Sequence, residues 1–391
     1  MALIFLHAHA AHADGLQALS RALAQIQRDA ARHTAFKPTL AFLYFSDHHA
    51  AQAEALVELL RTAWPGVSIT GGVGIGVSAS GVEYFDEPGV ALMLCDLPRA
   101  SFTLFSGRAP LTRDDAWSAL VHADPGTHEL PALLGELSER LQSRYLFGGL
   151  ASSRTRTLTL ADDVFEGGLS GVAFGADVAL VSRVTQGCQP LGKARRVSSA
   201  ERNLVLQLDD QPALPLLLSE LGVDLSDPAR AVSALRRTLV GLTDEGDTAL
   251  ARGGQFGADT RVRHLIGVDP ARDAIAIGDI AEVGSQLAFC ARDVEAARRD
   301  LVRICSEVRE EAESSVAIAG NESVAAPRRI AGAIYVSCTG RGGAHFGAPS
   351  AELQTVRRAL GDVPLVGFYA AGEIARHHLY GYTGVLTAFL D

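Results

Sequence analysis

A glycine-bearing loop that follows a strand-like segment occurs three times in this chain of 391 residues. The loops read TGGVGIG at residues 70–76, LFGGLAS at 146–152 and VGFYAAG at 366–372. An apolar strand-like segment follows each loop after an insert of variable length. Such recurrence predicts an internal repeat. Because glycine-punctuated strands occur in many unrelated proteins, the alternative that the three loops are unrelated stays open.

The segments around the first and last loops predict parallel strand pairs. LAFLYF at residues 40–45 is typical of a buried strand, and an amphipathic helix and a second strand follow it. Near the end of the chain, a strand at 329–338, a helix at 350–361 and a strand from residue 363 repeat this order. Strand, helix and strand in succession indicate a parallel pair joined by a crossover helix.

The length of the chain suits two domains of ordinary size. Between about residues 184 and 208 the strand pattern gives way to a polar segment and then returns. We therefore predict an α/β fold with two related halves, each a mixed β-sheet flanked by helices. The first domain would span residues 1–190 and the second residues 191–391.

Charge and composition exclude some classes of partner. The formal net charge of −10 argues against a nucleic-acid partner, because phosphate binding needs a basic surface. The amino terminus has no basic region or cleavage site of a signal peptide, and no apolar run approaches the length of a membrane span. We therefore expect a cytoplasmic protein that does not insert into a membrane.

The five cysteines form no Cys-x-x-Cys pair, and their number is odd. A disulfide framework or a structural zinc site is therefore not expected. Cys188 and Cys338 each lie in or beside a glycine-rich turn, which favours an accessible thiol. A nucleophilic cysteine also needs a base in space, and no Cys-His catalytic pattern is visible. A ligand-contacting thiol is thus favoured over a catalytic one.

The loop after residue 338 carries the clearest ligand chemistry. Ligands of open α/β sheets bind beyond the carboxyl ends of the strands, where this loop is expected to lie. Arg341 offers a planar fork suited to a carboxylate, and Glu373 in the neighbouring loop offers the opposite charge. The two would suit the two ends of an amino acid, or they would pair with each other. We name as ligand-binding candidates Cys338, Thr339, Arg341, Gly342, Tyr369, Glu373 and Cys188.

Histidines are the remaining candidates for chemistry. His7 and His9 would point to one side of a strand, as in a two-histidine metal clamp, but no third ligand lies nearby in the sequence. A haem needs one histidine in an apolar pocket, and no Cys-x-x-Cys-His attachment motif is present. The haem candidates are His48, His49 and His345, each of which also suits a surface or capping role.

Several motifs together resemble the FIST domain. YVSCTGRGGAHFG, VPLVGFYAAGEIA and LYGYTGVLTAF resemble its carboxy-terminal half, and FSDHH with WPGVSITGGVGIGVS resembles its amino-terminal half. The resemblance covers nearly the whole chain. One departure is visible: many relatives have Gly-Glu where this chain has Gly76-Val77. A ligand amine expected there would lack its carboxylate.

The resemblance implies a sensory protein of signal transduction that binds a small ligand. The resemblance does not name the ligand, but the opposite charges of Arg341 and Glu373 favour an amino acid or another small carboxylate. One branch of the family binds haem and responds to nitric oxide, which implies haem as an alternative cofactor and a histidine kinase or other signalling protein as partner. An enzyme that uses a cysteine is a further alternative.

Overall fold

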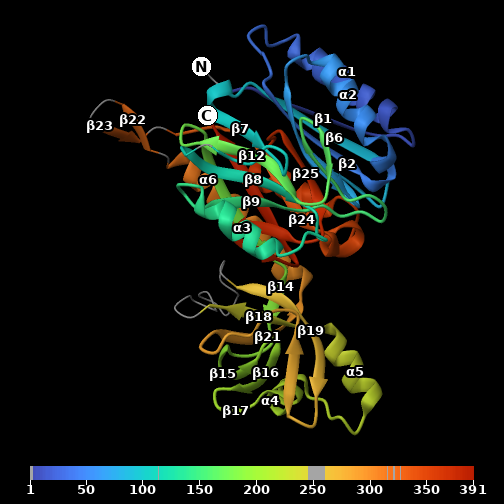
Figure 1. Cartoon of the computed structure of the whole chain (residues 1–391), viewed down its shortest axis with the longest axis vertical. Coiled ribbons are helices and arrows are strands. Elements are labelled where there is room, and N and C mark those ends of the chain that lie inside the picture. The colour runs from blue at the N-terminus through green and yellow to red at the C-terminus, as the bar shows by residue number, and fades with distance from the viewer. Residues whose placement is uncertain (1–2, 113, 245–259, 315, 320–321, 326) are drawn as a thin grey trace. The chain divides into compact units, whose positions relative to one another are not determined.

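The computed structural model describes residues 3–391 apart from 113, 245–259, 315, 320–321 and 326. The chain divides into two compact units (Figure 1). The first unit contains Met1–Thr185 and Arg298–Asp391, and the second contains Gln186–Ala297. Each unit is described by itself below. Among the described residues, no helix combines the length and the apolar character that crossing a bilayer requires.

The first unit contains three six-stranded sheets with the same strand order. Each sheet is built on a parallel pair whose strands are joined by a helix, which the sequence predicts for the first and third of them. The pairs are β2 (Leu40–Ser46) with β3 (Ser68–Gly74), β8 (Ala116–Ala123) with β9 (Tyr145–Leu150), and β24 (Ile330–Cys338) with β25 (Leu365–Ala370). The joining helices are α2 (Ala53–Ala63), α3 (Leu130–Glu139) and α7 (Ala351–Leu360).

Two further strands extend each parallel pair on one side. A returning strand pairs antiparallel with the first strand of the pair, and an edge strand pairs with the returning strand. The returning strands are β6 (Gly89–Cys95), β12 (Leu169–Gly175) and β28 (Thr383–Leu390). The edge strands are β1 (Phe5–Ala11), β7 (Phe102–Phe105) and β13 (Ala179–Gln186).

The three repeats exchange hairpins, which interlocks them. The hairpin of the first repeat completes the third sheet, that of the second completes the first sheet, and that of the third completes the second sheet. The exchange therefore closes a ring. The hairpins are β4 (Gly76–Ala79) with β5 (Val82–Phe85), β10 (Leu158–Ala161) with β11 (Val164–Glu166), and β26 (Glu373–Arg376) with β27 (His378–Tyr380).

One glycine recurs at the same place in each repeat. Gly71, Gly148 and Gly367 each face the backbone of the parallel partner strand, where an added Cβ would lie 1.9, 2.0 and 1.8 Å from a carbonyl oxygen. Only a residue without a side chain lets the strands approach this closely. These glycines belong to the three loops of the sequence, so the predicted internal repeat is confirmed.

The three sheets surround one apolar core, and helices cover their outer faces. Phe42, Phe147, Phe368 and Phe389 are among the buried residues of this core and come from all three sheets. Asp14 caps helix α1 (Gly15–Ala30), because its side chain accepts a hydrogen bond from the Leu16 N–H. Helix α6 (Val294–Glu313) and the hairpin of β22 (Val316–Ala319) with β23 (Glu322–Ala325) precede β24.

The second unit is inserted between β13 and α6. Its sheet closes on itself, because β21 pairs with both β15 and β18. Val240, Ile275 and Phe289 are among the residues of its core. Its elements are β14 (Cys188–Pro190), β15 (Arg195–Glu201), β16 (Leu204–Leu208), β17 (Gln211–Pro212), α4 (Ala213–Leu221), α5 (Pro228–Arg237), β18 (Thr238–Thr243), β19 (Arg261–Asp269), β20 (Ala274–Ile277) and β21 (Gln286–Arg292).

The α/β class with mixed sheets and flanking helices is thus confirmed. The parallel pairs bring the carboxyl ends of β24 and β25 together, and the exchanged strand β26 starts beside them. The candidate site lies there.

Candidate functional site

Arg341 is the largest fully buried side chain among the described residues, with 1% of its surface exposed. It lies in the helical turn Thr339–Arg341 that follows β24. Its Nε donates a hydrogen bond of 2.8 Å to Glu352 Oε1, and its Nη2 lies 2.6 Å from the same oxygen. The ring of Phe346 packs 5.0 Å from the guanidinium carbon. The carboxylate that holds Arg341 is therefore Glu352 of α7.

Glu352 accepts two further hydrogen bonds from β24. Tyr335 donates to its Oε1 at 2.7 Å, and Ser337 donates to its Oε2 at 2.9 Å. Burial disfavours the charged form of Arg341, but the field of Glu352 outweighs it and raises the pKa of the guanidinium. Burial also raises the pKa of Tyr335, so its hydroxyl remains a donor. Both oxygens of Glu352 are thus hydrogen-bonded, whereas Nη2 of Arg341, although close to Glu352 Oε1, makes no hydrogen bond of suitable geometry among the described residues.

Tyr369 lies on β25 and joins a second buried carboxylate. Its hydroxyl donates to Glu83 Oε2, and Glu83 Oε1 accepts from the Ser350 N–H at 2.7 Å. Glu83 belongs to β5 and reaches this place only through the exchange of hairpins. Burial raises the pKa of Glu83 and of Tyr369, and hydrogen bonds to Glu83 oppose its shift.

Phe85 covers this part of the site. A Cβ added to Gly342 would lie 2.1 Å from its ring, so Gly342 is the residue type that this contact requires. The same ring packs edge-on against Tyr369, with centroids 5.0 Å apart. Phe85 is half-buried and packs against two of the predicted ligand residues, Gly342 and Tyr369.

Glu373, the first residue of β26, has one carboxyl oxygen with hydrogen bonds and one without. Its carboxyl is fully buried, and Oε2 accepts from the Thr383 N–H at 3.1 Å and the Thr383 hydroxyl at 2.7 Å. Its Oε1 has no hydrogen-bond partner in the described structure. Burial raises the pKa of Glu373 to about 8, although the bonds from Thr383 and the charge of Arg341 lower it. At neutral pH the carboxyl is therefore mostly protonated.

Cys338 ends β24 and lies beside the Glu373 carboxyl, which affects its titration. Burial and the field of Glu373 raise the pKa of the Cys338 thiol to about 12. The nucleophilic thiolate is therefore scarce at neutral pH. The structure thus brings together Cys338, Arg341 and Glu373, with Thr339, Gly342 and Tyr369 adjacent on the same strand ends. Cys188 lies in the second unit, at the start of β14.

Two carboxylates of the site were missed by the sequence reasoning. Glu352 has a signal in the sequence, because it shares the apolar stripe of α7 with Val356 and Leu360 at intervals of four residues. A carboxylate on such a stripe needs a buried partner. Glu83 has no comparable signal, since its neighbours depend on the exchanged hairpin.

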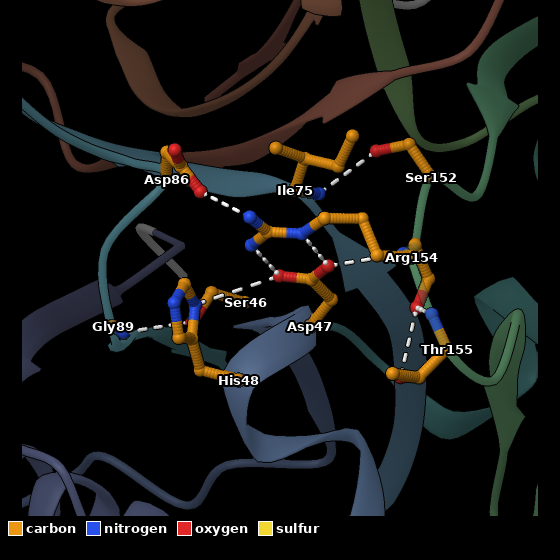
Figure 2. Close-up of polar contacts among 10 residues, drawn as sticks. Ser46, Asp47, His48, Ile75, Asp86, Gly89, Ser152, Arg154 and Thr155 are labelled. Carbon is orange, nitrogen blue, oxygen red and sulfur yellow. Dashed lines mark hydrogen bonds and ion pairs between the residues drawn. The ribbon is translucent and has the colours of Figure 1, made fainter.

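A second arginine network lies at the carboxyl end of β2 (Figure 2). Arg154 spans the Asp47 carboxylate, with Nε and Nη2 each 2.8 Å from a different oxygen, and its Nη1 donates to Asp86 at 2.5 Å. Burial opposes the ionisation of Asp47, but the hydrogen bonds from Arg154 keep its pKa below the ordinary value. Half of the Arg154 side chain is exposed.

The haem candidates lack the surroundings that a porphyrin needs. The ring of His49 is buried under the start of α1, since a Cβ on Gly15 would lie 2.9 Å from its Cγ. His48 lies 3.5 Å from the Asp47 carboxylate, and His345 packs edge-on against Phe346. Three pockets formed by described residues contain no histidine. The surroundings of these three histidines therefore do not fit a haem.

The described histidines, cysteines and acidic residues also form no group of three that is suited to a metal ion. His9 of the predicted clamp bonds instead to the Tyr84 hydroxyl at 2.7 Å. Burial is the main reason that the pKa of His7 falls to about 4 and that of His9 falls below its ordinary value.

Fold and site together define an α/β protein with three interlocked repeats and a buried polar centre beneath an aromatic side chain. Family models match most of the chain: the FIST N domain matches residues 39–211 and the FIST C domain matches residues 213–376. The protein therefore belongs to the FIST family, as the motifs of the sequence predict. FIST domains are associated with the sensing of small ligands in signal transduction.

Similar proteins occur in mycobacteria. An uncharacterised protein of Mycobacterium tuberculosis is 31% identical over 372 residues, which cover 90% of this chain and 92% of the relative. An uncharacterised protein of Mycobacterium bovis is 30% identical over 372 residues, with 90% and 91% covered. The similarity to each of these relatives covers nine-tenths of this chain, and their names describe no ligand.

Proposed function

We propose that this protein is a sensory module that binds a small carboxylate, such as an amino acid, at Glu373. One observation carries the proposal: Glu373 Oε1 is buried without a hydrogen-bond partner among the described residues. A buried polar atom of this kind costs about 1–3 kcal/mol unless a ligand or an ordered water completes it. The proposal assigns that place to the ligand.

The protonation state of Glu373 supports the choice of ligand. With a pKa of about 8, the carboxyl is a hydrogen-bond donor at neutral pH. A donor favours an acceptor oxygen, and the positive charge of Arg341 nearby favours a negative one. Because Glu352 already occupies the fork of Arg341, the ligand would be held by Glu373 and attracted by Arg341 from a distance.

Access requires a movement of the aromatic cover. Phe85 lies over Gly342 and Tyr369, and the polar residues below it are buried. A ligand that binds only when Phe85 is displaced would stabilise that displaced state, and the shift in population would be the signal. A histidine kinase or another signalling protein that recognises this state completes the proposal.

The other predictions from the sequence gain no support from an observation. The surroundings of His48, His49 and His345 do not suit haem, and the raised pKa of Cys338 does not suit thiol catalysis. A cytoplasmic location stays part of the proposal, because all five cysteines are free thiols, as is usual in reducing compartments. The division of the chain at residue 190 also stays a prediction.

Thermal melting in the presence of amino acids and small dicarboxylates tests the proposal. We expect one class to raise the melting temperature of the native protein, and Glu373→Leu to abolish that rise at pH 7, because leucine has no donor. Glu54→Leu, at an exposed site, is the matched control. Native mass spectrometry of freshly purified protein shows any bound metabolite directly. A ligand-induced rise that is equal in native protein and Glu373→Leu would overturn the assignment.

A further inference from the structure

A pocket lies at the opposite end of the sheets from Glu373. It has a volume of about 270 Å³ and is open at the amino ends of β8 and β9, with β13 and β28 on its other side. Ser118 and Tyr145, which are register partners on β8 and β9, both line it. The pocket lies at the edge of the central core, since Phe147 in its wall also belongs to that core.

One buried hydroxyl in this wall has no partner. Ser118 is 4% exposed, and its Oγ makes no hydrogen bond to any described residue. A serine hydroxyl both donates and accepts, so leaving it buried and unpaired costs free energy that a bound polar group would recover. This observation is independent of the shape of the pocket and points to a ligand.

Apart from Arg183 and Glu311, the other polar side chains that line the pocket are mostly hydroxyls. Ser182 and Thr387 face each other with their oxygens 2.8 Å apart. Burial raises the pKa of Tyr145, which keeps its phenol neutral, although a hydrogen bond with Ser182 opposes the shift. Neutral groups that both donate and accept match the hydroxyls of a ligand and give a charged ligand no counter-ion.

Arg183 does not change this selectivity. Its Nε lies 3.0 Å from Glu307 Oε2 and its Nη2 lies 2.5 Å from Glu311 Oε2, so two carboxylates share its charge. Glu307 also pairs with Arg303 at 2.5 Å, so the charged groups at this rim already pair with one another, which disfavours phosphates and carboxylates. Trp117, 44% exposed, adds a large flat surface at the opening.

We infer that this pocket binds a neutral polyhydroxylated ring of monosaccharide size. The ring would place an apolar face on Trp117 and direct its hydroxyls to Ser118 and to the pair of Ser182 and Thr387. The volume is just below the usual range for drug-sized ligands, which limits the occupant to one ring. The pocket is separate from Glu373, so this inference does not depend on the proposed function.

Intrinsic fluorescence gives a direct test, because the chain has two tryptophans. Trp64 packs edge-on against Phe36 in another part of the unit, so Trp64→Phe leaves Trp117 as the only indole. This variant is titrated with glucose, galactose and myo-inositol, and with glucuronate and glucose 6-phosphate as charged counterparts. We expect a saturable change with at least one neutral probe at or below about 10 mM, and at least tenfold weaker binding of its charged counterpart.

Variants in the Trp64→Phe background separate a site from a surface effect. Ser118→Ala should weaken binding about fivefold through the lost hydrogen bond, and Ser118→Val should abolish it by filling the wall. Ser170→Ala, at a buried serine outside the pocket, and Glu373→Gln should leave it unchanged. If Ser118→Val unfolds the protein, Ser118→Ala alone decides. Absence of saturation with every neutral probe, equal binding of charged probes, or no effect of Ser118→Ala overturns the inference.

Discussion

Two arginine–carboxylate networks lie at the ends of strands in the same three-repeat unit, yet their arginines differ in burial. Arg154 bridges Asp47 and Asp86 with half of its side chain exposed (Figure 2), whereas Arg341 is 1% exposed and is held by Glu352. Water reaches Arg154, although the carboxylate of Asp47 is only 3% exposed, and it reaches neither member of the second pair. The network of Arg154, called the open network below, needs no explanation beyond its contribution to the fold. The sealed network carries a desolvation cost that tertiary structure has to offset, which favours a functional role for its surroundings.

The largest predicted effect separates the two networks by stability. Arg341→Met leaves Glu352 buried without its cation, and we expect a loss of about 3–5 kcal/mol in the free energy of unfolding. Chemical denaturation measures this loss. The double variant with Glu352→Leu should recover most of it, since no buried charge remains. A loss below about 1 kcal/mol for Arg341→Met alone would show that the network is not sealed in solution.

The second prediction concerns pH. The pKa of Glu373 is raised to about 8 in the folded protein, so the folded state keeps a proton that the unfolded state releases above its own, lower pKa. Stability from this group is therefore present in acid and is lost as pH rises through about 8. His7, with its lowered pKa, acts in the opposite direction below about 6.5.

Between pH 6.5 and 8, Glu373 should therefore be the only one of these two groups whose titration changes the free energy of unfolding. We expect the stability of the native protein to fall by at most about 1.4 kcal/mol per pH unit there, and the slope to flatten in Glu373→Gln. Denaturation at half-unit intervals of pH provides the measurement. Parallel slopes for the two proteins would contradict the raised pKa.

The open network should give a smaller effect. Arg154→Met removes a half-exposed arginine but leaves the buried Asp47 carboxylate without its cation, so we expect a loss of about 1–3 kcal/mol, below that of Arg341→Met. Because both variants replace arginine by methionine, each is the control for the other. Equal losses in the same denaturation assay would remove the distinction between the networks.

Salt should give the smallest difference and sharpen the comparison further. Raising the ionic strength to 1 M shortens the screening length to about 3 Å, which should reduce the effect of Arg154→Met. The effect of Arg341→Met should not change, because ions do not reach a buried pair. Denaturation of both variants in low and high salt measures the two responses, and a strong response at Arg341 would indicate solvent access.

Local patterns predicted much of this fold. The strand–helix–strand order predicted two of the three parallel pairs, and the glycine loops marked positions such as Gly148 where two backbones approach closely. Each of these features depends on residues that are near one another in the chain, which is why sequence alone sufficed.

The partners in the site depended on distant parts of the chain. Arg341 and Glu373 were expected to pair with each other or with a ligand, but Glu352 eleven positions along holds Arg341. Glu83 reaches Tyr369 because the first repeat donates its hairpin to the sheet of the third. No periodicity in the sequence encodes that exchange, so it became visible only with the assembled sheets.

The ionisation of Glu373 tests the central claim most directly. The carboxyl resonances of protein labelled with ¹³C at the glutamate side chain can be followed with pH, and the signal missing in Glu373→Gln identifies the residue. A midpoint near 8 is expected if the carboxyl is a buried acid that faces a ligand as a donor. A midpoint near the ordinary value of 4.5 would show a charged, solvated carboxylate and would contradict the account.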